Sequence, residues 1–237
     1  MKTKRLKRQV EVPAPFREED YRKAARLPTI HLDDICRVEY TLSSQQPVGL
    51  YDVPLDELLS VVRRQSCDAW IFDGDEIAGG VQLQRYSFPA FADNEYIIDI
   101  MDMDSAEEYE LASALADQFE DIGEEIGAYG DLVEINRVWI KPTSSIVGRS
   151  SDIVHALIGA FCPDFSTIVL KAYPLEYEQY REGSIGPALR DSFKRRQLAM
   201  MRLYTRTYGV HAMDGVFPVS DHETDRPNCL RRISGTS

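Results

Sequence analysis

A glycine-containing loop between a strand-like and a helix-like segment is the first candidate for chemistry in this sequence. Residues 131–142 (DLVEINRVWIKP) form a long strand-like run, and the loop TSSIVGRSS leads from it into an amphipathic helix. A helix N-terminus presents unpaired backbone N–H groups and a partial positive charge, and glycine lets a backbone approach an anion closely. We therefore expect Gly148 and the backbone amides of Arg149, Ser150 and Ser151 to suit a pyrophosphate.

The same loop has a purely structural interpretation. A loop followed by a capped helix needs no ligand, and short motifs of this kind often mislead. The guanidinium of Arg149 could add a charge-assisted contact to phosphate, or it could be a solvated surface group. Both interpretations of the loop stay open on the sequence.

Other reactive residue types do not form a recognisable pattern. The cysteines and histidines are scattered singly, with no C-x-x-C pair and no spacing typical of a metal site: Cys36, Cys67, Cys162, Cys229, His31, His155, His211 and His222. No Ser-His-Asp arrangement and no nucleophilic serine or cysteine motif can be assembled. We expect no metal, reduced thiols and a cytoplasmic protein.

The first half of the chain reads as strands and helices of distinct patterns. Residues 36–42 alternate as a strand, residues 54–64 place leucines on one helical face, and Gly74 with Asp75 marks a long-armed hairpin. Residues 96–101 look like a further strand. Ser105 and Glu108 form a capping box for a helix whose apolar face is Leu111, Leu115, Phe119, Ile122 and Ile126.

The second half alternates between helices and strands. The helix after the loop buries Val154, Leu157, Ile158 and Phe161, and the continuous apolar run 167–173 predicts a central strand. A long helix spans 187–204, and residues 210–219 suit a final hairpin. We expect one α/β domain over 31–219, with an acidic insertion at 87–130, a tail or short helix at 1–30 and a disordered tail at 220–237.

The overall charge excludes several function classes. The 237 residues include 39 acidic and 27 basic side chains, which gives a formal net charge of −12. Nucleic-acid binding needs a basic face, so this balance argues against it. No run of 18 apolar residues is present, and the basic first eight residues lack an apolar run after them, so neither membrane insertion nor export is indicated.

The order of these elements resembles the GNAT superfamily, the acyl-CoA-dependent N-acyltransferases. The segments that carry the resemblance are WIFDGDEIAGG, VEINRVWIKP with its loop, and LYTRTYGV, within about residues 36–219. The loop of that family has Gln or Arg, then Gly, then Gly or Ala where this chain has Ser145, Gly148 and Ser150, so one position of three agrees. The resemblance implies a mixed, mostly antiparallel central sheet flanked by helices.

The resemblance also implies a cofactor edge and a base. The edge of the long strand at Val138, Trp139 and Ile140 would pair with the pantetheine arm of acetyl-CoA or another acyl-CoA. Glu134 matches the glutamate that some members use as a general base, and strand alternation predicts that it shares a face with Val138. Its alternative role is a solvated strand residue.

A tyrosine near the end of the last long helix protonates the leaving thiolate in many members of the family. Tyr204 resembles this tyrosine, although four residues, instead of three, separate it from the following glycine, and Tyr208 is the alternative. Both tyrosines could equally be packing aromatics. Residues 134–140 (EINRVWI) also resemble a motif of the acyl-homoserine-lactone synthases, with Asn136 in place of a hydroxyl residue, and that motif contains the same glutamate.

The acidic segment suggests what the acceptor could be. From residue 86 to residue 136 there are 15 Asp or Glu residues and no Lys or Arg. Such a surface attracts cations, which favours a polyamine, an aminoglycoside-like amine or a basic protein segment as the acceptor. The alternative is a solvated helix face that keeps the protein soluble. The basic helix at 190–206 could contact the cofactor's nucleotide, bind the acidic insertion in a homodimer, or be solvated.

Two functions from different classes follow. The favoured one is an enzyme that transfers an acyl group, with acetyl preferred, directly to an amine: Glu134 is the base, strand amides hold the oxyanion and Tyr204 is the acid. The other is a GNAT-fold protein that has lost catalysis and binds a partner through its acidic face. The residues at Ser145 and Ser150 and the spacing of Tyr204 favour the second function.

Overall fold

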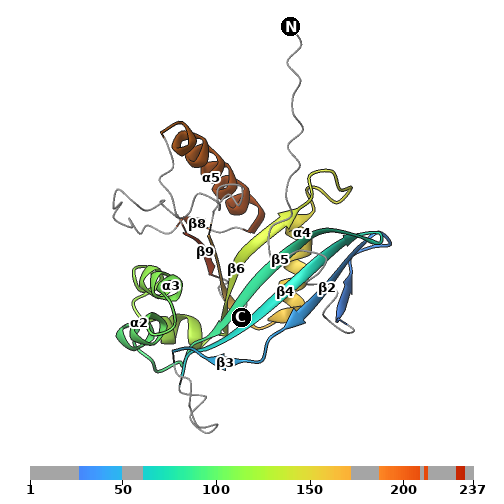
Figure 1. Cartoon of the computed structure of the whole chain (residues 1–237). Helices are drawn as coiled ribbons and strands as arrows, with labels where there is room; N and C mark the ends of the chain where they lie inside the picture. Colours follow the sequence, from blue (N-terminus) through green and yellow to red (C-terminus); the bar gives the residue numbers. More distant parts are fainter. Residues whose placement is uncertain (1–26, 50–60, 172–186, 209–210, 213–227, 233–237) are drawn as a thin grey trace.

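One large sheet organises the molecule. The computed structural model describes residues 27–49, 61–171, 187–208, 211–212 and 228–232. Within them, nine strands form a sheet in the order β1-β2-β4-β5-β6-β7-β9-β8, with β3 paired to β4 (Figure 1). The strands are β1 (Thr29–His31), β2 (Cys36–Leu42), β3 (Gln46–Pro47), β4 (Arg63–Asp73), β5 (Glu76–Ser87), β6 (Asp131–Ile140), β7 (Phe165–Lys171), β8 (His211–Ala212) and β9 (Asn228–Arg232).

Parallel pairing is confined to one pair of strands. β6 and β7 run parallel and are joined by helix α4 (Ser150–Phe161), as a parallel crossover requires, while every other described pair is antiparallel. The predicted mixed, mostly antiparallel sheet flanked by helices is therefore confirmed. None of the described helices is long and apolar enough to cross a membrane.

The β4–β5 hairpin confirms the prediction made around Gly74. Its arms pair from Arg63↔Ser87 to Asp73↔Glu76, and Gly74 turns the chain with φ of +62°. A second glycine, Gly79, lets β5 approach β6, because a Cβ there would lie 2.3 Å from the carbonyl oxygen of Trp139. The hairpin and β6 therefore form a tightly paired centre.

The regular structure of the acidic insertion after β5 is helical, which corrects one prediction. Residues 96–101, expected as a strand, belong to helix α2 (Asn94–Asp102). Asp93 caps this helix by accepting a hydrogen bond from the N–H of Tyr96 at 2.8 Å, and the buried side chains recur at helical spacing: Ile97, Ile100 and Met101. The apolar run was mistaken for a strand because a short run does not separate the two periods.

The second insertion helix begins at the predicted capping box. Ser105 accepts a hydrogen bond from the N–H of Glu108 at 3.2 Å, and α3 spans Ala106–Ala116. The observed helix α3 is shorter than the predicted one. Phe119 lies beyond its end, and Ile126 lies in a separate π-helical turn, η2 (Gly123–Gly127). All five predicted apolar side chains are nevertheless buried.

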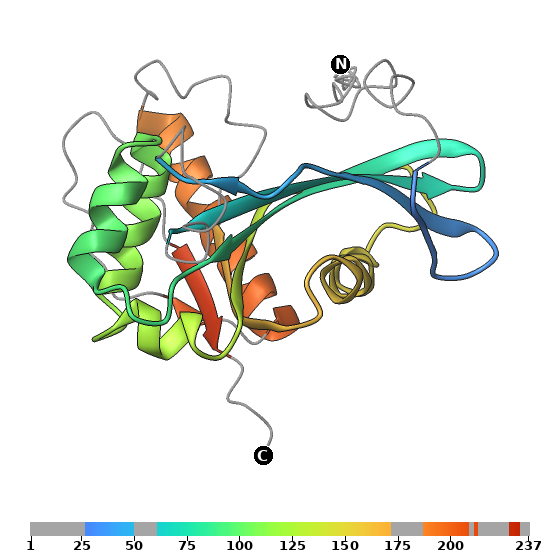
Figure 2. The same ribbon diagram turned by 90° about the horizontal axis from the view of Figure 1, so that it is seen from below.

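Helices cover the two faces of the sheet differently. In Figures 1 and 2 the insertion helices α2 and α3 lie together at one end of the sheet, and α4 lies against the other face. The α4-side cluster includes Val38, Ile71, Val133, Ile135, Val154, Leu157 and Phe161. The insertion-side cluster includes Val62, Tyr86, Ile97, Leu111, Leu115, Leu132 and Val169. The predicted apolar face of α4 is confirmed.

The chain ends differ in part from expectation. The tail after residue 220 was expected to be disordered, but Asn228–Arg232 form β9, which pairs antiparallel with β7. Of the predicted hairpin at 210–219, residues 211–212 form β8 beside β9, and the predicted helix at 187–204 is α5 (Pro187–Tyr208). Most of the predicted helix at 54–64 and of the N-terminal tail at 1–30 lies outside the described residues, although Arg63 and Arg64 belong to β4.

Candidate functional site

Glu134 lies in the centre of the sheet, beneath the acidic insertion. Its partners in register are Gln84 on β5 and Val169 on β7. Val169 belongs to the insertion-side cluster. The residue is only 3% exposed. A carboxylate at this depth has to be supported by polar neighbours, because burying a charge without partners is strongly unfavourable. The alternative of a solvated strand residue is therefore wrong for Glu134.

Tyr86 supplies a direct hydrogen-bonding link from Glu134 to the insertion. Its hydroxyl lies 3.5 Å from Oε2 of Glu134 and 3.3 Å from Oε1 of Glu108, and it also contacts Oε1 of Gln84. Glu108 comes from the first turn of α3 and is 5% exposed. The two glutamates thus approach the same phenol from two different elements, one from the sheet and one from the insertion.

Arg64 on β4 supplies the positive charge of this group. Its guanidinium pairs with Glu108 and, at 2.7 Å, with Asp104, while the hydroxyl of Ser105 donates to the other oxygen of Glu108. Burial alone would lower the pKa of Arg64, but Glu108 and Asp104 outweigh it and raise that pKa. The guanidinium therefore remains charged throughout the accessible pH range.

Electrostatics keep Tyr86 protonated. Desolvation is the largest cause that raises the pKa of this phenol well above 10, and the carboxylates of Glu134 and Glu108 add to it. Tyr86 therefore acts as a hydroxyl group, not a phenolate, near neutral pH. Sequence reasoning identified Glu134 and the capping role of Glu108 but missed Tyr86 and Arg64, since nothing in their local pattern shows that β4, β5 and α3 converge.

A bulge in β6 corrects the predicted orientation of Glu134. Ile135 pairs with Leu83 but Arg137 pairs with Gln82, so Asn136 is an extra residue. The extra residue reverses the alternation beyond it, and Val138 packs against the α4-side cluster while Glu134 contacts Tyr86 on the insertion side. The prediction that Glu134 and Val138 share a face is therefore wrong.

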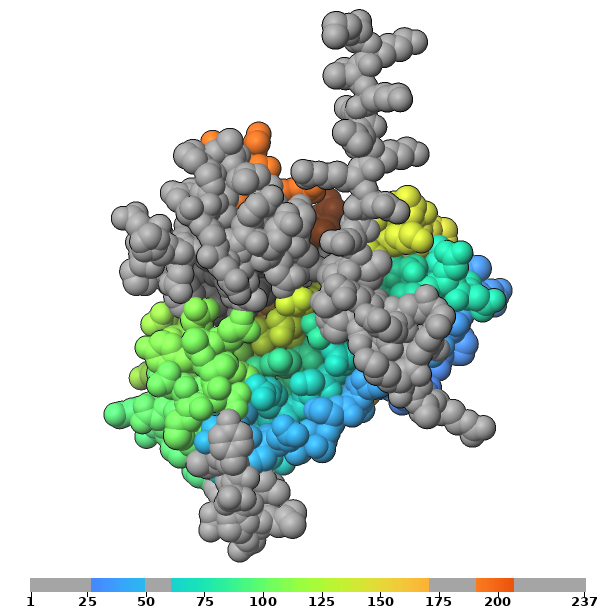
Figure 3. Space-filling model, viewed as in Figure 1, coloured from blue at the N-terminus to red at the C-terminus, as the bar shows by residue number. Residues whose placement is uncertain are grey.

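The described pairing of β6 with β7 ends at Ile135, one residue after Glu134, and the described part of β7 ends at Lys171. The parallel pairing runs from Asp131 to Ile135, whereas β6 itself continues to Ile140. Val138, Trp139 and Ile140 pair with β5 on one side and, among the described residues, with no strand on the β7 side. In Figure 3 the insertion (green) forms a surface beside the strands of the hairpin (teal). The edge of β6 is thus open in the sheet at the predicted residues.

The loop before α4 is held by a carboxylate from the hairpin. Asp73 accepts hydrogen bonds from the hydroxyl of Ser144 at 2.7 Å and from both the N–H and the hydroxyl of Ser145 at 2.8 Å. These bonds lower the pKa of Asp73. Gly148 has φ of +94°, which suits glycine, and the space around it is open. The loop is therefore anchored at Ser145 and open at Gly148.

Arg149 is engaged within the protein. Its guanidinium pairs with Asp33, and its backbone N–H donates to the carbonyl oxygen of Ile146 at 3.1 Å. Of the three predicted amide donors, that of Arg149 is consequently already used. Ser150 and Ser151 form the first turn of α4, where backbone N–H groups lack helical partners, and Asp152 adds a negative charge to the same turn.

Tyr204 lies on the other side of the sheet from the carboxyl group of Glu134. It is half-buried and packs against the α4-side cluster together with Met201. The side chain of Tyr208, the alternative residue, lies outside the described residues. The structure therefore brings Glu134 together with Tyr86 and Glu108, and it places Tyr204 on the face that carries α4.

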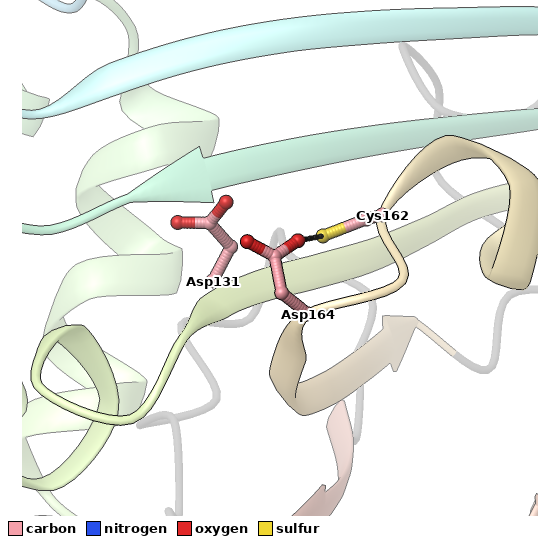
Figure 4. A group of neighbouring side chains, drawn as sticks. All are labelled: Asp131, Cys162 and Asp164. Atoms are coloured by element: carbon pink, nitrogen blue, oxygen red, sulfur yellow. Dashed lines mark hydrogen bonds between the residues drawn. The ribbon is translucent and has the colours of Figure 1, made fainter.

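A second group of polar side chains lies where β6 begins. Asp131, Cys162 and Asp164 each bring one oxygen or sulfur atom within 4.8 Å of the others, and the thiol of Cys162 contacts Asp164 (Figure 4). Arg85 pairs with both carboxylates. Burial raises the pKa of the Cys162 thiol to about 12, so this thiol is a poor metal ligand. The guanidinium of Arg85 therefore balances one of the two carboxylates, and the other, Asp164, is 67% exposed.

Comparisons with known proteins give little further information. No protein-family model matches the chain, and no curated protein matches it. A solved structure of FeeM, an N-acyl amino acid synthase from uncultured soil microbes, is 12% identical to this chain. The match covers 70% of this chain and 67% of that chain, with a TM-score of 0.34. A match with this TM-score carries no argument about the activity of this chain.

Proposed function

We propose that this protein is a GNAT-type N-acyltransferase that moves an acyl group, acetyl being the preferred one, from acyl-CoA to an amine. The observation that carries the proposal is a buried carboxylate, Glu134, which lies one residue before the end of the described pairing between β6 and β7. A substrate that lies along β6 beyond this pairing would come within reach of such a base. The strand order, the crossover through α4 and the open edge at Val138–Ile140 agree with the resemblance seen in the sequence.

The loop suits acyl-CoA through its backbone more than through its side chains. Gly148 has the positive φ and the open space that a close approach of phosphate requires, and Ser150 and Ser151 begin α4. Arg149 is paired with Asp33, and Asp73 holds the start of the loop. Binding would therefore depend on Gly148 and the first-turn amides, with the edge of Val138, Trp139 and Ile140 holding the pantetheine arm.

The mechanism assigns one role to each side chain of the site. Bound acyl-CoA supplies the thioester that the amine attacks. Glu134 accepts the proton of the amine, so that the nitrogen lone pair becomes available. Backbone N–H groups of β6 near the bulge stabilise negative charge on the acyl oxygen. The hydroxyl of Tyr204 protonates the departing thiolate, and because Tyr204 lies on the α4 side of the sheet, this role requires the thioester to cross the edge of β6 between the two faces.

We further propose a cationic acceptor. The insertion covers the face that contains Glu134, and its helices α2 and α3 carry exposed acids such as Glu95, Asp99 and Glu107. The segment from residue 86 to residue 136 contains 15 acidic residues and no Lys or Arg. A negative potential around the site raises the local concentration of cations, as a polyamine or a lysine side chain requires.

A second candidate is a binding protein without catalysis. Five large apolar side chains of the insertion are exposed among its acids: Phe91, Tyr96, Met103, Tyr109 and Tyr129. Aromatic groups beside carboxylates suit a basic peptide. The engagement of Ser145 by Asp73 and of Arg149 by Asp33 also favours this candidate, since it reduces the number of groups left for a nucleotide.

Calorimetric titration of acetyl-CoA and of free CoA distinguishes the two candidates. The acyltransferase predicts micromolar binding that falls at least about tenfold in Gly148→Asp, because a carboxylate at the loop repels phosphate and the positive φ disfavours a side chain. Gly159→Asp is the matched control. Gly159 lies in α4, the helix that follows the loop, and it also has open space around it. No binding at millimolar ligand would contradict the acyltransferase proposal and favour the binding protein.

A further inference from the structure

We infer that the protein forms a symmetric dimer in which the basic face of α5 in one copy docks on the acidic face of α2 in the other. Two-fold symmetry makes this contact twice, because each copy offers both helices. The inference goes beyond the proposed function. It concerns assembly, and it holds whether or not the protein transfers an acyl group.

The outward face of α5 combines cations with exposed leucines. Phe193 is buried and Tyr204 packs against the α4-side cluster, so these residues mark the inward face. Leu198 and Leu203 are 52% and 43% exposed. The exposed bases on the same helix are Lys194, Arg195, Arg196, Arg202 and Arg206. Such a face suits a partner surface that is acidic and partly apolar.

The outward face of α2 has the complementary composition. The helix buries Ile97, Ile100 and Met101, and every acid it contains is exposed: Glu95, Asp99 and Asp102. It contains no Lys or Arg. Met103 directly follows the helix and is 53% exposed. This face therefore offers carboxylates and an apolar side chain to the cations and leucines of α5.

The charges of the two helices recur at the same spacing. The pairs that lie seven residues apart are Glu95 and Asp102 on α2 and Arg195 and Arg202 on α5. Seven residues are two helical turns, about 10 Å. Met103 directly follows the second acid, and Leu203 directly follows the second base. Two helices packed side by side can thus pair both charges and bring the apolar side chains together, as in interhelical ion pairs of coiled coils.

The distribution of charge over the helices favours a second copy as the partner. Of the described helices, α5 alone contains Lys or Arg. Each copy has a formal net charge of −12, so two copies repel each other at long range. At 0.15 M salt this repulsion is screened beyond about 8 Å, whereas charges in contact still attract. A basic helix on an acidic chain therefore selects which surfaces of two copies meet.

The two faces are placed so that a second copy can reach both. Within one copy, α5 packs on β8 and β9, and α2 packs on α3. In Figures 1 and 2, α2 and α5 both lie in the part of the molecule away from the turn of the β4–β5 hairpin. The contact uses α2, so the acids of α3 stay available to the proposed cationic acceptor.

Exchanging the charges of the two faces tests the dimer. The α5 variant carries Lys194→Glu, Arg195→Glu and Arg202→Glu, and the α2 variant carries Glu95→Lys, Asp99→Lys and Asp102→Lys. We expect the wild type to sediment with the mass of two chains at 0.15 M salt. Each variant alone should dimerise at least about tenfold more weakly, because like charges then meet. An equal mixture of the two variants should restore the dimer, since both contacts again join opposite charges.

A third variant controls for net charge and for folding. Asp34→Lys, Asp75→Lys and Glu76→Lys change the net charge as the α2 variant does, but at the hairpin end. This variant should dimerise like the wild type and should not restore the dimer when mixed with the α5 variant. Circular dichroism checks that all three variants are folded.

Three outcomes would overturn the inference. One is a wild type that sediments as a single chain up to its solubility limit, including one that binds phosphatidylserine vesicles through the basic face of α5 instead. Another is a dimer that neither variant weakens. The third is a pair of folded variants whose mixture stays monomeric, since that result would assign the two faces to different contacts. Acyl transfer is measured separately, so the loss of either proposal leaves the other in place.

Discussion

Each face of the sheet holds a half-buried arginine with carboxylates, but the two groups differ in net charge and in exposure. On the α4 side, Arg85 pairs with Asp131 and with Asp164, and Asp164 is 67% exposed. On the insertion side, Arg64 pairs with Asp104 and Glu108, and Tyr86 extends the group to Glu134. Water can screen the surplus charge of the first group but has little access to the second.

This difference indicates which of the two groups, that of Arg64 or that of Arg85, is suited to take part in a reaction. A neutralised ion pair beside a solvated carboxylate stabilises the start of β6 and requires no ligand. A buried surplus of carboxylates, held away from water, is the arrangement in which protonation of one member becomes favourable and useful. We therefore propose that the insertion-side group, and not the group around Arg85, takes part in the reaction.

Replacing one carboxylate on each face of the sheet by its amide should give the largest difference in kcat. We expect Glu134→Gln to lower kcat for transfer to an amine by about 10²-fold or more, because the amide cannot accept the proton. Asp131→Asn on the α4 side should leave kcat within about threefold while the variant stays folded. Steady-state kinetics with acetyl-CoA and spermidine would measure both. Equal losses in the two variants would contradict the assignment of function to one face.

Removal of each arginine should separate the groups in stability. Arg64→Met leaves the buried carboxylates of the insertion side without their cation, and we expect the free energy of unfolding to fall by about 3 kcal/mol. Arg85→Met should reduce it by about half as much, since Asp164 remains solvated. Urea denaturation at pH 7 measures both changes. A larger loss for Arg85→Met would reverse the comparison.

Neutralising the exposed acids of the insertion should have a smaller effect. The triple variant Glu107→Gln, Glu110→Gln and Asp117→Asn should lower kcat/KM for spermidine by about threefold to tenfold at low salt, and the loss should shrink in 0.5 M salt. Glu108 is left intact because it belongs to the buried group. The control neutralises acids at the hairpin end: Asp34→Asn, Asp75→Asn and Glu76→Gln. A similar loss in the control would contradict steering by the insertion.

The smallest expected effect concerns the anchor of the loop. The pKa of Asp73 lies below its ordinary value of 3.8 because Ser144 and Ser145 donate to the ionised form. A lowered pKa in the folded state means that the stabilisation is present above pH 3.8 and is lost as pH falls below that value. The stability difference between wild type and Asp73→Asn, followed by urea denaturation, should therefore shrink between pH 5 and pH 3. A difference that stays constant over this range would show that Asp73 acts through something other than its charge.

Local patterns predicted most of the fold. The alternation of residues 36–42, the turn at Gly74 and the apolar face of α4 each depend on neighbours in the chain, and each prediction is confirmed. Residues 96–101 were wrongly expected as a strand, because six residues contain too few turns to separate a period of two from one of 3.6. The strand at 228–232 was missed because its pairing with β7 depends on a distant segment.

The candidate site was only partly visible. Glu134 could be proposed from its place in a strand, and Glu108 was recognised only as part of a helix cap. The bulge at Asn136 was invisible, because one extra residue in a strand leaves no mark in the local pattern, yet it decides which face each later side chain occupies. Strand alternation without the bulge therefore predicts that Glu134 and Val138 share a face. In the structure they lie on opposite faces.

The sequence by itself determined the acidic insertion, the long hairpin, the glycine loop and a glutamate in the central strand, since composition and short-range periodicity suffice for these. Only the tertiary structure decided that Tyr86, Arg64 and Glu108 meet Glu134, because they come from three elements that are distant from one another along the chain. The physical reason is that burial and electrostatic coupling depend on distance in space. Those two properties, and not residue type alone, make Glu134 a candidate base.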